Sequence, residues 1–212
     1  MKQLILATFI LVNLNSFSQD TKGYVPINNI EGLTKKLNAN SIKTNSITSD
    51  FVQEKYLDDL SSTIVSKGKF WLKKDNRLRW EYTEPFNYIV IINNKQVFVE
   101  DGNSSSAHTN KKPNKIFRQL SEILASSVNG TLINDPRFTI KVSENKDLYK
   151  VVLIATDEEE RQNLSEVQLF LYKTNLTVYR VILPEPNGDS TTVTFKNKKL
   201  NVAIADEVFR ID

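Results

Sequence analysis

The sequence contains no cysteine, one histidine, six glycines and six prolines in 212 residues. Without cysteine the chain forms no disulfide and has no attachment point for a lipid anchor, so a hydrophobic core must stabilise an exported domain. One histidine is too few for a usual zinc site, which takes several ligands from His and Cys. The six glycines are dispersed and form no Gly-rich phosphate-binding loop.

The sequence offers no recognisable catalytic centre. His108 lies in a polar stretch, and no Gly-x-Ser-x-Gly nucleophile motif occurs to place a serine beside it. The densest acidic run, residues 157–160, has the like-charge character of a solvated loop between two strands. We therefore expect an exposed histidine, no cofactor, no metal and no enzymatic activity. An esterase acting through His108 is the alternative that stays open.

The N-terminus predicts export. Lys2 precedes a mostly apolar run from Leu4 to Leu14, and small residues follow at 16–18. This run of about a dozen residues is shorter than the roughly 20 needed to cross a membrane. We expect residues 1–18 to be a signal peptide and 19–212 to be one periplasmic domain, with an uncleaved anchor as the alternative. The balance of 28 basic against 25 acidic residues, mostly scattered, argues against nucleic-acid binding.

Two helices and about ten strands are predicted from hydrophobic periodicity. Ile30, Leu33 and Leu37 mark a first helix over 29–38, and a second helix follows Pro113 and ends at Asn129-Gly130. The strand candidates are 47–56, 61–73, 77–83, 87–93, 95–100, 137–143, 148–155, 165–173, 176–184 and 190–197, with a short one at 208–211. Such a succession of hairpins predicts a mainly β (α+β) fold, an antiparallel sheet that curls toward a barrel.

One hairpin carries the most distinctive pattern. From Gly68 to Pro85 two alternating strands flank a polar turn, and the second places Leu78, Trp80 and Tyr82 on one face and Arg79 on the other. A second signature, Phe-x-Gln-x-Lys, lies upstream at 51–55. Together these stretches resemble the periplasmic lipoprotein carrier family, LolA. The matching hairpin positions are Gly68, Lys73, Asn76, Arg79, Trp80, Tyr82 and Pro85.

The resemblance implies an unclosed antiparallel β-barrel, or half-barrel, with a helical lid over an apolar cavity. It also implies a carrier that shelters the acyl chains of lipoproteins and moves them from the inner to the outer membrane. The expected partners are acylated lipoproteins, an inner-membrane ABC lipoprotein-releasing transporter and an outer-membrane acceptor, with the carrier acting as a monomer.

The resemblance also implies functional residues. The expected cavity residues are Phe51, Phe70, Leu78, Trp80, Tyr82, Val90 and Ile92. The expected lid residues are Ile116, Phe117, Leu120, Ile123 and Leu124. The residues expected to gate the cavity or to contact a partner are Lys74, Leu78 and Arg79. For each aromatic position taken singly, an ordinary packed core is the favoured alternative to a cavity lining. Strand 87–92, apolar on both faces, must be covered on both.

One departure from the family pattern concerns the lid. The family has Arg-Pro where this chain has Lys74-Asp75, and that arginine is associated with holding the empty cavity closed. Lysine lacks the planar fork of arginine, so we expect a weaker or differently made latch. Two other functions stay open: a carrier of this kind for another acylated lipid, such as a glycolipid or an aryl-polyene lipid, and a periplasmic lipoprotein-sensing regulator of the RseB type.

Overall fold

A computed structural model describes residues 23–210, with the exception of 75, 95 and 102–114. The expected signal peptide, the polar loop after residue 101 and His108 therefore lie outside the described residues. None of the helices within the described ranges has the length and apolar character needed to cross a lipid bilayer.

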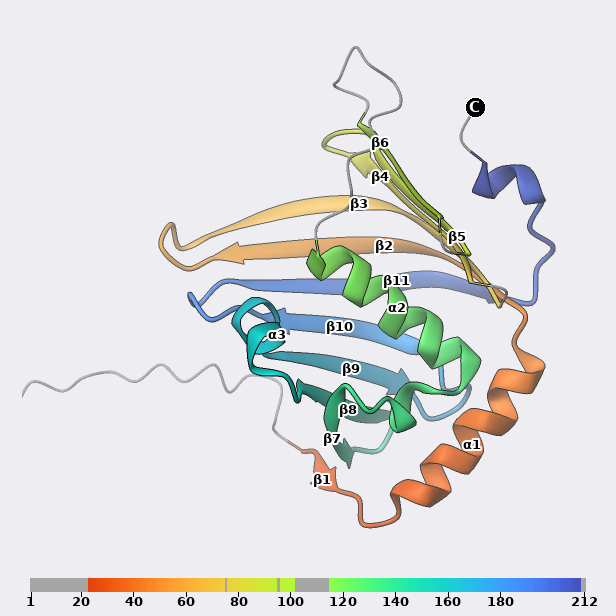
Figure 1. The fold of residues 1–212 in the computed structure, drawn as a ribbon, viewed down its shortest axis with the longest axis vertical. Coiled ribbons are helices and arrows are strands. Elements are labelled where there is room, and N and C mark those ends of the chain that lie inside the picture. The colour runs from red at the N-terminus through yellow and green to blue at the C-terminus, as the bar shows by residue number, and fades with distance from the viewer. Residues whose placement is uncertain (1–22, 75, 95, 102–114, 211–212) are drawn as a thin grey trace, which may run out of the picture.

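Eleven strands form one antiparallel sheet (Figure 1). The strands are β1 (Val25–Pro26), β2 (Ser46–Leu57), β3 (Ser62–Lys73), β4 (Arg77–Glu84), β5 (Tyr88–Asn93), β6 (Gln96–Asp101), β7 (Phe138–Glu144), β8 (Leu148–Ala155), β9 (Glu166–Tyr172), β10 (Val178–Pro184) and β11 (Ser190–Leu200). Their order is β1-β7-β8-β9-β10-β11-β2-β3-β4-β5-β6. Strands β1 and β6 form the two edges and do not pair with each other, so the predicted unclosed antiparallel architecture is confirmed.

The alternation of side chains divides the sheet into an inner and an outer face. Phe51 of β2, Phe70 of β3, Trp80 of β4 and Phe195 of β11 are all buried on the inner face. Trp80 pairs with Phe70 on one side and with Val90 of β5 on the other. Residues that lie opposite one another on neighbouring strands share a face, so the bulky side chains of successive strands meet inside the curved sheet.

Two helices pack against the core on the inner side, and Figure 1 shows one of them lying across the strands and the other beside their right-hand ends. Helix α1 (Ile30–Lys43) begins at Asn29, whose side-chain oxygen accepts a hydrogen bond from the Gly32 amide at 2.8 Å. It extends five residues beyond the predicted 29–38, and it contacts α2 (Lys115–Asn129). Gly130, with φ +77°, follows α2 as the predicted left-handed residue. A side chain at Gly130 would collide with Ser41 of α1, so the glycine lets the two helices approach.

Two short segments differ from the sequence-based prediction. The acidic run predicted as a loop belongs partly to a short helix, α3 (Glu158–Asn163), because glutamate has a high helix propensity and the segment stays exposed to water. The prediction of a strand at 208–211 is wrong for residues 208–210, and residue 211 lies outside the described residues. The chain instead forms a 3-10 helix, η2 (Asp206–Phe209), in which Phe209 packs against Ile91 of β5. A further 3-10 helix, η1 (Leu132–Asn134), was not predicted.

Helix η2 explains why β5 is apolar on both faces. Val90 lies on the inner face, opposite Trp80, whereas Ile91 lies on the outer face and is fully buried. Ile91 packs there with Ile204 and Phe209 in a second, smaller core. Asp206 anchors this segment through ion pairs with Lys73 and Arg77, with N–O distances of 2.8 and 2.7 Å.

Candidate functional site

The centre of the inner face is a cluster of aromatic side chains. Trp80 is fully buried, and its ring centroid lies 4.8 Å from that of Phe51 and 5.3 Å from that of Phe70. Phe195 and Tyr82 complete the cluster on the sheet side, at centroid distances from Trp80 of 6.0 and 6.3 Å. The predicted cavity residues Phe51, Phe70, Trp80 and Tyr82 are thus brought together.

Helix α2 closes this cluster from above. Its Phe117 ring packs edge-on against Trp80 at a centroid distance of 5.3 Å. The rest of its apolar stripe is buried in the same core: Leu120, Ile123, Leu124 and Val128. The side chain of Ile116, also predicted on this stripe, lies outside the described residues. Figure 1 shows α2 lying across the inner face over β9, β10 and β11, in the position expected of a lid.

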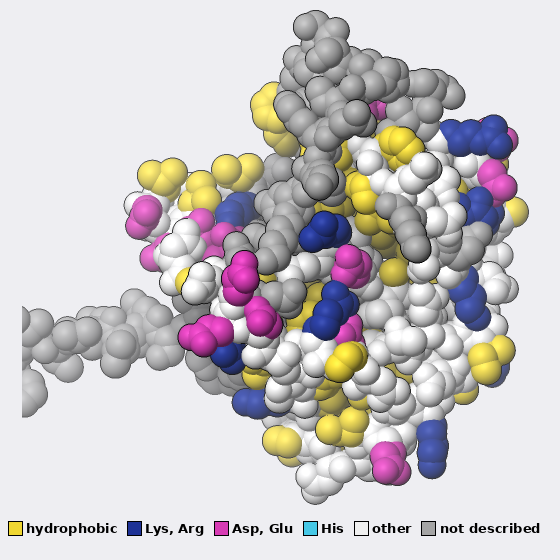
Figure 2. Space-filling view, viewed as in Figure 1, with side chains coloured by type: hydrophobic (Ala, Val, Ile, Leu, Met, Phe, Trp, Pro, Cys, Tyr) yellow, Lys and Arg dark blue, Asp and Glu magenta, His cyan; other side chains and the backbone are white. Residues whose placement is uncertain are grey.

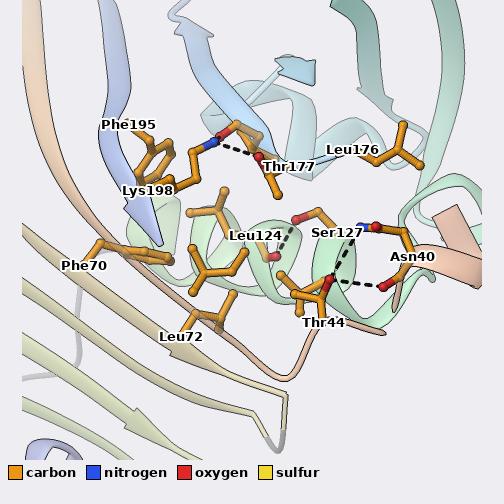
Figure 3. Close-up of a pocket in the computed structure, with 13 residues that line it drawn as sticks. Asn40, Thr44, Phe70, Leu72, Leu124, Ser127, Leu176, Thr177, Phe195 and Lys198 are labelled. Carbon is orange, nitrogen blue, oxygen red and sulfur yellow. Dashed lines mark hydrogen bonds between the residues drawn. The ribbon is translucent and has the colours of Figure 1, made fainter. Parts of the chain in front are cut away.

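A small cavity remains beneath the C-terminal half of α2 (Figure 3). Its volume is about 30 Å³, the space of roughly one water molecule. The apolar lining comes from the sheet, from α2 and from the turn between β9 and β10: Ile47, Phe70, Leu72, Phe195, Leu124, Val128, Leu176 and Val178. A cavity of this size is too small for a long apolar chain, so such a ligand fits here only if α2 moves away from the sheet.

A lysine amine occupies one end of this cavity, which the sequence analysis did not anticipate. Lys198 Nζ donates to Thr177 Oγ1 at 3.0 Å and, over a short distance, to the Val178 carbonyl oxygen. It also lies 5.2 Å from the centre of the Tyr172 ring. Burial lowers the pKa of Lys198 to about 8. The only sequence signal was a group of lysines at 196–199, which by itself reads as surface charge.

A groove of about 290 Å³ runs along the other side of α2. Leu78 of β4 and Ile92 of β5 line it opposite Ser121 and Ala125 of α2. Leu78 and Ile92 are paired neighbours on the inner face, and they lie where α2 meets the turns at the ends of β3 and β5. Val90, by contrast, is fully buried beside Trp80 on the neighbouring strand and lines neither this groove nor the cavity beneath α2.

The residues of the second sequence signature, Phe51-x-Gln53-x-Lys55, make contacts that stabilise the fold. Gln53 Oε1 accepts a hydrogen bond from the Tyr82 hydroxyl at 2.8 Å, which satisfies a polar group beside the aromatic cluster. Burial raises the pKa of Tyr82, so the phenol stays protonated. Lys55 forms ion pairs with Glu185 and Asp189 at the far end of β2 and joins β2 to the β10–β11 hairpin.

The three residues predicted to gate the site lie in different places. Lys74 Nζ donates to the Ser41 carbonyl oxygen of α1 at 2.9 Å, so it connects the β3–β4 turn to the C-terminal end of a covering helix. Arg79 lies on the outer face, where it pairs with Glu81 at 2.8 Å and stacks over Trp71. Arg79 also donates to the Val208 carbonyl, so the geometry gives it contact with the C-terminal segment rather than with the helices.

The Lys74 contact can be tested directly. A cation near the C-terminal end of a helix also interacts favourably with the helix dipole. We expect Lys74→Met to lower the free energy of unfolding by about 1 kcal/mol and Lys74→Arg to retain most of it. Urea denaturation measures both, with Lys69→Met, an exposed lysine on the outer face of β3, as the matched control. Equal stability of the Lys74→Met and Lys69→Met variants would show that the latch contributes nothing.

Hydrophobic side chains also gather at the tip of the β2–β3 hairpin, at the left of Figure 2. Leu60, Ile64 and Val65 are all exposed there, between 47% and 70%. Single exposed aliphatic residues are common, but three at one tip form a candidate contact surface. No sequence pattern distinguishes these three residues from the rest of the hairpin. No group of acidic, His or Cys side chains suited to a metal ion occurs among the described residues.

Solved structures that are similar to this chain share little sequence identity with it. An uncharacterised conserved protein from Thermus thermophilus matches with a TM-score of 0.50 and 9% identity, over 86% of this chain and 94% of that one. A LolA superfamily protein from Nitrosomonas europaea matches with a TM-score of 0.45 and 10% identity, over 84% and 97%. MucB in the MucA/MucB complex of Pseudomonas aeruginosa matches with a TM-score of 0.46 and 14% identity, over 84% of this chain and 60% of that one. No curated protein matches this chain.

The sequence model of one family covers most of the chain. It is described as "Outer membrane lipoprotein carrier protein LolA" and matches residues 42–212. The match includes every strand of the inner-face cluster and the whole of α2, and leaves out only the N-terminal region and most of α1. This protein therefore belongs to the LolA family, whose members are periplasmic lipoprotein-binding and carrier proteins rather than enzymes.

Proposed function

We propose that this protein is a periplasmic carrier that shelters the acyl chains of lipoproteins and moves them from the inner to the outer membrane. In this proposal residues 1–18 are a signal peptide and 19–212 form a single monomeric carrier domain. An inner-membrane ABC transporter releases the lipoprotein to the carrier, and an outer-membrane acceptor takes it. The predicted cavity, lid and gating residues serve this function.

The observation that carries the proposal is the contact between α2 and the aromatic cluster. The sheet is open, and its inner face is apolar and covered by a helix that no backbone ladder ties to the strands. Such a helix can leave the sheet as a unit, and its apolar stripe can then cover acyl chains in place of Trp80 and its neighbours. Each methylene group removed from water contributes about 0.8 kcal/mol, which gives the acyl chains a reason to enter.

A transfer experiment tests this proposal. A purified triacylated lipoprotein in detergent is diluted below the critical micelle concentration in the presence of the protein, and soluble complex is measured by size-exclusion chromatography. We expect a soluble one-to-one complex. In a Trp71→Phe background, which leaves Trp80 as the single tryptophan, we also expect a change in Trp80 emission as Phe117 moves away.

The matched control is the same lipoprotein without its acyl groups, which should form no complex. Precipitation of the acylated lipoprotein beside a folded, unchanged carrier would contradict the proposal. Mass spectrometry of the material that co-purifies from the native periplasm then identifies the cargo. A specific non-protein lipid in place of lipoproteins would move the function to a specialised lipid carrier.

A further inference from the structure

We propose, on the basis of the acyl-binding function above, that Lys198 binds the carboxylate of a single-chain fatty acid at one end of the cavity beneath α2. The amine lies at one end of the cavity beneath α2, and the remaining wall is mostly apolar. Figure 3 shows its side chain reaching from β11 toward Thr177, with Phe195 and Leu124 beside it. A long apolar chain with one anionic end matches this arrangement.

The backbone of β11 delivers the amine to this position. The pairing of β11 with β2 shifts between Lys196 and Lys199, and Asn197 adopts a left-handed conformation with φ +52°. This bulge turns Lys198 toward the same inner face as Phe195, and both residues line the cavity. Ser49 Oγ fixes the bulge by donating to the Lys196 carbonyl at 2.6 Å. The backbone conformation of β11 therefore directs the Lys198 side chain toward the cavity.

The amine contacts no acidic side chain within the described part of the chain. Its partners among the described residues are the Thr177 hydroxyl, the Val178 carbonyl and the Tyr172 ring, and none of them carries a negative charge. An ammonium has three donors, and these contacts occupy two of them. Burial depresses the pKa of Lys198 only to about 8, so the ammonium form still predominates at neutral pH. One donor and one positive charge remain for a ligand.

The surroundings of the amine select the ligand class. The other polar groups in the cavity wall, on Asn40, Thr44, Thr177 and Ser127, are neutral. A phosphate or a dianion would need more positive charge, whereas one ammonium balances one carboxylate. From the amine, Phe195 and Phe70 lead directly to the Trp80 cluster, with ring centroids 5.2 Å apart. A fatty acid bound head-first at Lys198 would extend its chain along this aromatic path once α2 has moved.

The test compares two ligands that differ only in the head group. Palmitate and hexadecanol, each delivered as its cyclodextrin complex, are titrated into the Trp71→Phe protein while Trp80 emission is followed. We expect palmitate to bind at least about tenfold more tightly than hexadecanol, as a charge-assisted hydrogen bond provides. Lys198→Met should remove this preference and leave hexadecanol affinity nearly unchanged. Lys199→Met, which alters the exposed neighbouring lysine, should keep the preference.

The outcomes separate this inference from the function on which it rests. Equal affinity of the unaltered carrier for palmitate and hexadecanol would overturn the role of Lys198 and leave acyl binding intact. A preference that survives in Lys198→Met would overturn it as well. If neither ligand binds, the acyl-binding function itself fails, and the inference fails with it. The comparison of the two ligands on the unaltered side chain needs no variant at position 198, so a folding defect cannot obscure the result.

Discussion

Replacing Gly68 with alanine is expected to lower the free energy of unfolding by about 3 kcal/mol or more. A Cβ atom at this position would lie 2.0 Å from the Glu81 carbonyl oxygen and 2.7 Å from the Phe51 ring. The first collision is with backbone, so no side-chain rotation relieves it. Gly68 pairs with Phe51 in β2, and the register of β3 with β4 shifts beside it. The glycine thus lets the ring and the neighbouring strand approach together.

Urea denaturation measures this effect, and Gly32→Ala is the matched control. A Cβ atom at Gly32 meets only the end of the Asn29 side chain, at 2.9 Å, and alanine is also the better helix former. We expect Gly32→Ala to stay within about 1 kcal/mol of the unaltered protein. If Gly68→Ala is equally mild, the close packing of Phe51 over β3 is not what stabilises the hairpin. The glycine in the family motif would then need another explanation.

Much of the inner face follows from sequence alternation alone. Leu78, Trp80 and Tyr82 were predicted on one face and Arg79 on the other, and the structure places them so, because a strand leaves a side chain no third direction. The amphipathic stripe of α2 was readable for the same kind of reason, since its apolar residues recur at helical spacing. Local periodicity therefore located the cluster and its cover.

Lys198 and the C-terminal segment could not be found in this way. The inward direction of Lys198 depends on a bulge at Asn197, and a shift of register reverses the face of every later residue. A one-residue insertion of this kind leaves no periodic signal. The segment at 208–211 was predicted as a short strand, but Val208 and Phe209 belong to the 3-10 helix η2. Its actual shape depends on Ile91, far away in sequence, needing cover on the outer face.

The packing of α2 sets an energetic condition for loading. Four side chains of its stripe are buried against the sheet: Leu120, Ile123, Leu124 and Val128. Each contributes about 1.5 to 3 kcal/mol, so these four side chains together account for about 6 to 12 kcal/mol of the cost of displacing the helix. At about 0.8 kcal/mol per methylene, this cost equals the burial of roughly 8 to 15 methylene groups. The cavity of about 30 Å³ is itself too small for an acyl chain, so binding at this position requires the displacement.

Binding should therefore depend steeply on chain length. Octanoate, too short to offset displacement of the helix, is expected not to bind, whereas palmitate is expected to bind. Beyond the threshold, each added methylene should tighten binding about fourfold. Trp80 emission in the Trp71→Phe background measures the series. Octanoate binding as tightly as palmitate would mean that the closed helix imposes no cost.

Weakening the helix should move this threshold. Leu120→Ala removes about 3 kcal/mol of packing from the closed state, where Leu120 is only 4% exposed. In the loaded state Leu120 packs less tightly, against mobile acyl chains, so Leu120→Ala destabilises the loaded state less than the closed state. The shortest chain that binds should become about three methylenes shorter. Arg118→Ala, at an exposed position on α2, is the control and should leave the threshold in place. An unchanged threshold in Leu120→Ala would mean that acyl chains enter without displacing α2, and the helix would then be a fixed wall of the core rather than its lid.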